Sequence, residues 1–320
     1  MKIKFEDVRF SRANTIKLNR INSIIDDYAA QGYRLTLRQL YYRLVSKDII
    51  ANNVKEYSKI GNLLTKGRLG GIVDWDAIED RVRVPDVPYF NSSVEQAVSD
   101  AVHHFRLDRT IGQGVHVELW VEKDAISNIM SRVTYHYGVR LMVNRGYSST
   151  TAMFDAYNRI QDSVNNGKEC TILYLGDHDP SGLDMVSHDI PNRLNDVFGT
   201  EVSVIPIAIT KRQIDQYDPP PNPAKISDPR AKWYIENYGK SSWEVDALEP
   251  NVLHNIVKDS IEKHLDMDVF NSVMAKEEKM RTELKKLPEM KNRVVGLGEF
   301  LKKTSLKKMP IAMIKKMLDV

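Results

Sequence analysis

Three acidic residues follow two apolar segments in a pattern that suits metal chemistry. Glu122 ends the segment VHVELWVE, and Asp177 and Asp179 follow the apolar run CTILYLG. Residues two apart on an extended chain face the same side, so Asp177 and Asp179 can point together while His178 points away. Converging carboxylates repel one another unless a cation lies near them. The sequence therefore predicts a site built from these three acids for Mg²⁺, which prefers oxygen ligands and binds substrate phosphate.

Each of these acids also has an ordinary structural interpretation. The helix dipole favours a glutamate at the start of a helix, where Glu122 would lie. Asp-x-Asp pairs such as Asp177 and Asp179 are common in turns and helix caps. The apolar runs before both groups favour the first interpretation, because they place the carboxylates at the tips of buried strands.

A parallel sheet with intervening helices would bring the acids together. Strand-like segments at 115–122, 139–144, 170–177 and 201–209 alternate with helical patterns. This βαβαβαβ order predicts an α/β fold whose parallel sheet has helices on both faces. Reactive groups in such sheets lie at the carboxyl ends of the strands, where the three acids fall.

The N-terminal region predicts three short helices, over 16–31, 37–48 and 57–69. Thr36 is suited to cap the second helix, and Gly70 with Gly71 ends the third. Segment 72–78 predicts a short strand or wing, so the region looks like a helix-turn-helix or winged-helix DNA-binding module. The basic residues on or just before the third helix are Lys55, Lys59, Lys66 and Arg68. We expect them to contact DNA phosphates; a solvated helix face is the alternative.

The remaining segments suggest a division into four regions. The segment 82–90, with two prolines, predicts a linker, and 93–109 predicts a helix. Residues 218–225 form a proline-rich excursion, and 251–320 predict a Lys-rich helical extension. The expected regions are a winged-helix domain over 1–85, a linker and helix over 86–114, an α/β domain over 115–250, and the helical extension.

Charge and composition fit a protein that binds a polyanion. The net charge is +7 over residues 1–75, −9 over 76–250 and +5 over 251–320. Basic flanks around an acidic centre suit such a protein with a metal-binding cluster, although random surface charge is an alternative. A single cysteine, Cys170, excludes an internal disulfide and fits a reducing cytoplasm. Without a signal-like start or a long apolar stretch, no membrane partner is expected.

Five segments resemble motifs of one protein family in the same order along residues 38–248. They are RQLYY (38–42), VEKDA (121–125), GYSS (146–149), GDHDPSGLDM (176–185) and EVDAL (244–248). The placement of a glutamate after the first strand and an Asp-x-Asp pair after a later strand resembles that of the Toprim fold. The full set resembles the topoisomerase VI A-subunit and the related meiotic double-strand-break proteins. The resemblance implies a winged-helix domain followed by a Toprim domain.

The resemblance also implies roles for individual residues. Tyr42 would be the nucleophile that attacks a DNA phosphodiester and forms a 5′-phosphotyrosyl link. Arg38, one helical turn earlier, would hold the scissile phosphate. Glu122 would serve as general acid/base close to the metal, and Asp177 and Asp179 would bind Mg²⁺. In the VEK motif, Lys123 could contact a phosphate; a surface lysine at a helix start is the alternative.

The implied partners are double-stranded DNA, a second copy of the chain and a separate ATPase subunit. In the family, the tyrosine of one protomer meets the Toprim site of the other, so a homodimer is expected. The chain departs from the family in two places: GYSS lacks a proline, and Asp246 stands where glutamate is usual. Without an ATPase, the chain could be a standalone nuclease of a phage, a mobile element or a defence system.

Two rival hypotheses remain open. In the first, metal-activated water cuts DNA and Tyr42 is structural, because aromatic residues on an amphipathic helix are usually core. In the second, the chain binds DNA without cutting it and carries a relic of the Toprim fold. The complete set of three acids argues against a relic.

Overall fold

The computed structural model describes residues 1–79 and 88–286. Most of the predicted linker and the last 34 residues lie outside these ranges. The described chain forms two compact units. One joins the residues up to 79 with Gly112–Met267, and the other joins residues 88–111 with 268–286. The three N-terminal helices and the central sheet therefore belong to the same unit.

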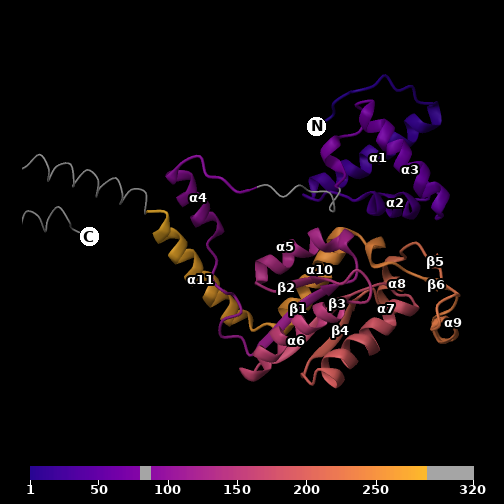
Figure 1. Cartoon of the computed structure of the whole chain (residues 1–320). Coiled ribbons are helices and arrows are strands. Elements are labelled where there is room, and N and C mark those ends of the chain that lie inside the picture. Colours follow the sequence, from indigo (N-terminus) through magenta and orange to yellow (C-terminus); the bar gives the residue numbers. More distant parts are fainter. Residues whose placement is uncertain (80–87, 287–320) are drawn as a thin grey trace, which may run out of the picture. The chain divides into compact units, whose positions relative to one another are not determined.

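A four-stranded parallel sheet forms the centre of the first unit (Figure 1). Its strands are β1 (Val115–Val121), β2 (Arg140–Val143), β3 (Glu169–Leu175) and β4 (Ser203–Ala208), in the order β2-β1-β3-β4. The expected parallel sheet is confirmed. Strands β1 and β3 are adjacent, and their last residues, Val121 and Leu175, are in register. The chain therefore leaves both strands at neighbouring points on one edge of the sheet.

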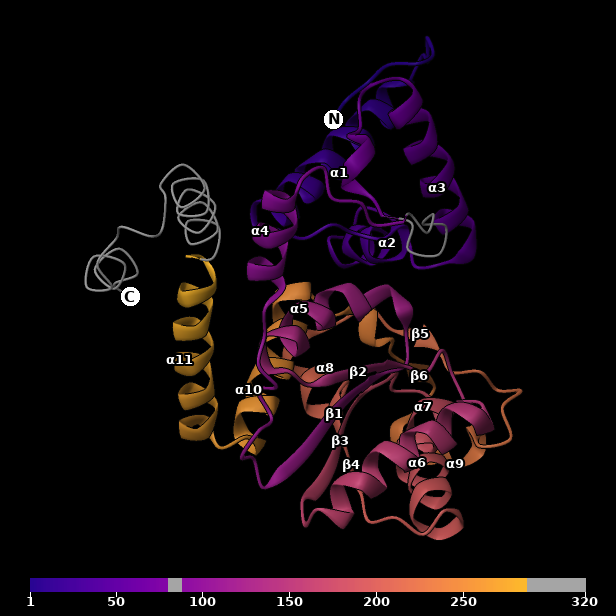
Figure 2. The ribbon, with the colours of Figure 1, turned by 60° about the vertical axis from the view of Figure 1, so that its left-hand side comes forward.

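Helices cover both faces of the sheet (Figures 1 and 2). One face carries α5 (Ser127–Tyr137) and α10 (Pro250–His264). The other carries α6 (Thr150–Asn165) and α7 (Pro180–Asp184), which continues into π-helical stretches over Met185–Asp189 and Asn192–Val197. On this second face Trp120, Ile172 and Tyr174 pack against α6 and the π-helical stretches. Apolar burial of this extent fixes the sheet and with it the positions of the strand ends.

A buried ion pair ties β1 to α6. Glu118 is fully buried, and Arg159 donates to both of its carboxylate oxygens at 3.0 and 3.1 Å. Trp120 Nε1 donates to the same carboxylate at 2.9 Å, and a ring nitrogen of His116 lies 3.2 Å from it. Burial alone would raise the pKa of Glu118, but bonds from His116, Arg159 and Trp120 outweigh it and lower the pKa to about 2.

The three N-terminal helices are α1 (Arg12–Ala30), α2 (Leu37–Ser46) and α3 (Val54–Leu69). Thr36 caps α2 in a capping box with Gln39, as its position predicts, and α3 ends at Gly70. The predicted strand or wing at 72–78 is wrong for the described residues. Trp75–Ala77 form a 3₁₀ turn, and Ile78 makes only an isolated bridge with Leu35. The N-terminal ammonium bonds Asp74 and Asp76, which favours the turn.

Shorter elements follow the sheet. Helix α8 spans Lys211–Tyr217 and α9 spans Ala231–Tyr238, and the two-residue strands β5 (Asn222–Pro223) and β6 (Ser241–Ser242) pair antiparallel. The second unit contains α4 (Val94–His104) and nearly all of α11 (Met267–Leu284), with Arg109 Nη2 2.8 Å from the buried Glu277 carboxylate. Among the described residues, no helix combines the length and apolarity that crossing a bilayer requires.

Candidate active site

Glu122 and Asp177 meet where β1 and β3 end. The Glu122 backbone N–H donates to the Leu175 carbonyl at 2.8 Å, which extends the pairing of the two strands by one step. The Glu122 carboxylate accepts a bond from the Asp177 backbone N–H, also at 2.8 Å. Gly176 is needed between them, because a Cβ there would lie 3.0 Å from Glu122 Oε2 and 2.4 Å from the Tyr174 ring. The sheet register therefore brings these two acids together.

Asp177 and Asp179 bond to different parts of the chain. Asp177 Oδ1 accepts from the Val245 backbone N–H at 2.9 Å. Asp179 caps α7, with Oδ1 accepting from the Gly182 N–H at 2.7 Å and from the Ser181 hydroxyl at 2.9 Å. The cap interpretation thus holds for one oxygen of Asp179. The negative charge of Asp179 nevertheless acts on Glu122 and raises its pKa, after the larger effect of burial.

His178, between the two aspartates, points into the core. It is 3% exposed and packs against the rings of Tyr234, Tyr238 and Trp243. Its Nδ1 lies 2.9 Å from the Tyr234 hydroxyl. His178 therefore holds the turn after β3 in place, as the alternation of side chains suggests.

Two further acids and two cations complete the group. Lys123 Nζ lies 2.8 Å from Asp177, 2.7 Å from Glu244 and 3.0 Å from Asp246. Arg38, from α2, ion-pairs with Glu244, and its Nε lies 3.1 Å from Asp246 Oδ2. We refer to the five acids as the acidic cluster: Glu122, Asp177, Asp179, Glu244 and Asp246. Lys123 lies within this cluster and not on the open surface that a simple phosphate contact would use.

The acidic cluster holds more negative charge than its two cations balance. Burial raises the pKa of Asp177 to about 8; Lys123 opposes the rise, while Glu122 and Asp246 add to it. Burial also tends to raise the pKa of Glu244, but the attraction of Lys123 and Arg38 lowers it to about 2. The charge is thus shared unevenly, and the acids at the strand ends are those that most need another cation.

The carboxylates of the acidic cluster are of the kind that binds a divalent ion, but their side chains are not arranged as ligands. No group of three acidic, histidine or cysteine side chains within 1–79 and 88–286 has metal-holding geometry. Lys123 instead supplies positive charge among the carboxylates. Carboxylate oxygens are the ligands that Mg²⁺ prefers, and Asp246 Oδ2, whose one close partner is the Arg38 Nε at 3.1 Å, makes no hydrogen bond. Residues Glu122, Asp177 and Asp179 could hold the ion after a rearrangement of side chains.

Tyr42 lies beside this cluster on α2. It is 4% exposed, and the Arg38 guanidinium lies over its ring at 5.8 Å from the centroid. Its neighbour Tyr41 is equally buried. Burial is the main cause that raises the pKa of Tyr42; Glu244 adds to the rise and Arg38 opposes it. The helical spacing thus puts Arg38 and Tyr42 on one face, with both near Glu244.

The basic residues expected to contact DNA differ in their surroundings. Lys55, Lys59 and Lys66 are exposed on α3, with Lys59 2.7 Å from Glu56. Arg68 is partly buried, donates to the carbonyls of Trp75 and Ile78, and is thereby engaged within the chain. The three lysines therefore lie at the surface, although Lys59 is paired with Glu56, whereas the Arg68 guanidinium stabilises the turn that follows α3.

Sequence reasoning did not name Glu244, Asp246 or Asn222 as site residues. The EVDAL motif contains Glu244 and Asp246, so the sequence did mark these acids, but its spacing could not show that they lie beside Lys123. Asn222, in the proline-rich excursion, gave no signal. The long separation along the chain hides these contacts, since Lys123 and Glu244 are 121 residues apart.

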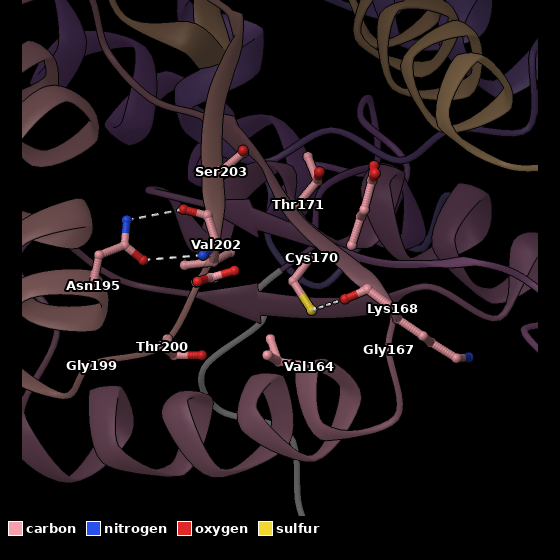
Figure 3. Close-up of a pocket in the computed structure, with 12 residues that line it drawn as sticks. Val164, Gly167, Lys168, Cys170, Thr171, Asn195, Gly199, Thr200, Val202 and Ser203 are labelled. Atoms are coloured by element: carbon pink, nitrogen blue, oxygen red, sulfur yellow. Dashed lines mark hydrogen bonds between the residues drawn. The ribbon is translucent and has the colours of Figure 1, made fainter.

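A separate cavity lies at the end of the sheet opposite the acidic cluster, where β3 and β4 begin (Figure 3). It has a volume of about 860 Å³ and includes Glu169 and Ser203, which begin β3 and β4. Its thiol, Cys170, donates to the carbonyls of Ile160 and Lys168, and burial raises its pKa. A raised pKa disfavours the reactive thiolate. This cavity therefore does not compete with the acidic cluster as the candidate active site.

Comparison of the chain with protein-family models, curated proteins and solved structures finds no match. A functional assignment therefore depends on the chemistry of the acidic cluster, Arg38 and Tyr42. The site brings carboxylates from two strand ends together with a tyrosine and an arginine from one helix.

Proposed function

We propose that the chain is a Mg²⁺-dependent DNA-cleaving enzyme of the topoisomerase VI A type, with an N-terminal helix-turn-helix domain and a Toprim domain. The observation that carries the proposal is the proximity of Arg38 and Tyr42 to the acidic cluster. A phenol, a guanidinium and several carboxylates are the groups that tyrosine transesterification of a phosphodiester requires.

In this mechanism Glu122, Asp177 and Asp179 would hold Mg²⁺, which when bound stabilises negative charge on the transferring phosphate. The Tyr42 oxygen attacks the phosphorus, a new O–P bond forms and the bond to the 3′ oxygen breaks. Glu122 takes the phenol proton as general base and gives a proton, as general acid, to the leaving 3′ oxygen, which becomes a hydroxyl. Arg38 lies close enough to Tyr42 to attract the phosphate, provided that it exchanges a carboxylate partner for the DNA.

The decisive experiment incubates the full chain with supercoiled DNA and Mg²⁺, then denatures the reaction with and without protease. We expect cleaved DNA covalently attached to protein at its 5′ end, and none when EDTA replaces Mg²⁺. Asp177→Asn should abolish the product. Intact DNA under all conditions would refute cleavage and favour a DNA-binding protein without catalysis.

A second candidate is hydrolysis by metal-activated water. The observation that favours it is the burial of Tyr42, which is 4% exposed and whose phenol has a raised pKa. The variant Tyr42→Phe separates the two candidates. Loss of cleavage supports the tyrosine mechanism, whereas cleavage at the wild-type rate with free 5′ ends supports water.

The proposed partners are double-stranded DNA, a second copy of the chain and, for strand passage, a separate ATPase subunit. The exposed lysines of α3 are the proposed phosphate contacts. Sedimentation of the chain with and without duplex DNA tests dimer formation. A chain that stays monomeric with duplex DNA would contradict the proposed dimer, which would cut both strands.

A further inference from the structure

A cavity of about 460 Å³ lies beside the Tyr42 phenol, between helices of the N-terminal region and the β5–β6 hairpin. Its polar lining includes Arg38, Tyr41, Asn52, Asn222 and Glu244. Asn222 comes from the proline-rich excursion, for which the proposed reaction has so far given no role. The cavity therefore joins a remote segment of the chain to the proposed nucleophile.

A chain of hydrogen bonds fixes the Asn222 amide. Asn52 Nδ2 donates to Asn222 Oδ1 at 2.9 Å, and Asn52 Oδ1 accepts from the Tyr41 hydroxyl at 2.9 Å. With its oxygen engaged, Asn222 turns its Nδ2 toward Tyr42 and donates to the phenol oxygen at 3.4 Å. The order of donors and acceptors along this chain determines which end of the Asn222 amide faces Tyr42.

The backbone around Asn222 is also held. Its carbonyl accepts from the Ser242 hydroxyl at 3.4 Å, and the two residues are paired between β5 and β6. Asn52 Nδ2 also donates to the Pro221 carbonyl at 2.7 Å. The Asn222 side-chain amide is therefore a preorganised donor, because bonds to its oxygen and to the surrounding backbone both fix its orientation.

We propose that Asn222 is a positioning residue that holds the Tyr42 phenol oxygen for attack on DNA. This inference depends on the proposed tyrosine mechanism. An amide donor on the phenol oxygen leaves the phenol proton free to depart and stabilises the oxyanion that remains. The charged groups acting on Tyr42 are Arg38, which favours the oxyanion, and Glu244 and Asp246, which oppose it.

The test compares the wild-type chain with Asn222→Ala and Asn222→Asp in single-turnover formation of the covalent adduct at saturating DNA. We expect Asn222→Ala to lower the rate about tenfold, the ratio expected for one hydrogen bond to a charged group. DNA affinity should stay unchanged, and the rising limb of the pH–rate profile should move to higher pH. Asn222→Asp keeps the shape but lacks the donor, so it should slow the reaction at least as much.

Ser241→Ala is the matched control, because it removes a hydroxyl from the same hairpin at a position that pairs with Pro223 and not with Asn222. It should form the adduct at the wild-type rate. If Asn222→Ala reacts at the wild-type rate with an unmoved pH profile, the role of Asn222 is refuted and the cleavage proposal stands. A parallel loss in Ser241→Ala would make the effect one of hairpin structure and also refute the role. A wild-type chain that forms no adduct would refute both proposals.

Discussion

The Lys123 ammonium lies within 3.0 Å of three carboxylates, two of which belong to a segment more than a hundred residues further along the chain. Burial tends to lower the pKa of Lys123, but attraction by Asp246, Asp177 and Glu244 outweighs it and raises the pKa. Lys123 therefore stays charged, and its charge keeps acids of both segments in one place.

Replacing Lys123 with methionine should destabilise the metal-free protein by about 3 kcal/mol, because buried carboxylates lose their main counter-charge. Urea unfolding with EDTA measures the loss, and millimolar Mg²⁺ should restore part of it. The control Lys59→Met removes an exposed pair with Glu56 and should change stability little. Equal stability of the two variants would show that Lys123 does not support the cluster.

At the scale of elements, the strand ends and the turns after them set the geometry of the site. Gly182, in the first turn of α7, lies so close to the Asp177 carbonyl that a Cβ would come within 2.1 Å of its oxygen. The same glycine donates to Asp179. Close approach of backbone to backbone therefore couples the start of α7 to both aspartates.

Gly182→Ala should displace the turn and reduce Mg²⁺-dependent cleavage at least tenfold, while the sheet stays folded. The control is Gly114→Ala, where a Cβ would meet no atom within 4 Å. Circular dichroism checks folding and the supercoiled-DNA assay checks activity. Normal cleavage by Gly182→Ala would mean that the turn tolerates the shift and does not position the acids.

The buried pair between β1 and α6 gives a pH-dependent contribution to stability. Since the folded pKa of Glu118 is about 2, below the ordinary value of 4.5, its contribution is present above pH 4.5. It is lost as the pH falls from 4.5 toward 2. Glu118→Gln should therefore cost about 3 kcal/mol near neutral pH and progressively less on acidification. Unfolding curves across this range check the slope; a constant difference between the proteins would contradict the assignment.

Much of the sheet was predictable, because apolar runs of strand length mark β1 and β3, and parallel order puts their ends side by side. Thr36 and Gly70 likewise mark helix ends through local chemistry. The contacts of Lys123, Glu244 and Asn222 were not predictable in the same way. They depend on where long turns fold back, and no periodic pattern records that. The turn at Trp75–Ala77 was missed because bonds to the chain's first residue stabilise it.

At the scale of the whole molecule, charge is distributed unevenly along the sequence, with a balance of +7 over the first 75 residues and −9 over the next 175. The exposed lysines of α3 belong to the first of these regions. A polyanion would therefore be attracted to the N-terminal helices and repelled by much of the central region. We expect DNA to approach the protein from the side of the N-terminal helices.

Duplex DNA binding should weaken steeply with salt, and each lysine that contacts a phosphate should contribute about 0.9 to the slope of log K against log [salt]. Lys55→Gln and Lys66→Gln should each lower the slope by about that amount. The control Lys258→Gln removes a lysine of α10 that pairs with Glu262 and should leave the slope unchanged. Fluorescence anisotropy over a salt series measures it, and an unchanged slope in all three variants would exclude α3 as the contact surface.

Two arginines of α2 bond to the same short stretch of chain, residues 244–249. Arg38 pairs with Glu244, and Arg43 donates to the Ala247 carbonyl and to Glu249. Tyr42 lies between them on the same helix. A movement of α2 that exposes the Tyr42 phenol must either break both sets of bonds or move residues 244–249 with the helix. Because the same stretch also bonds Lys123 and Asp177 at the strand ends, a movement of α2 that took it along would break the contacts that assemble the acidic cluster.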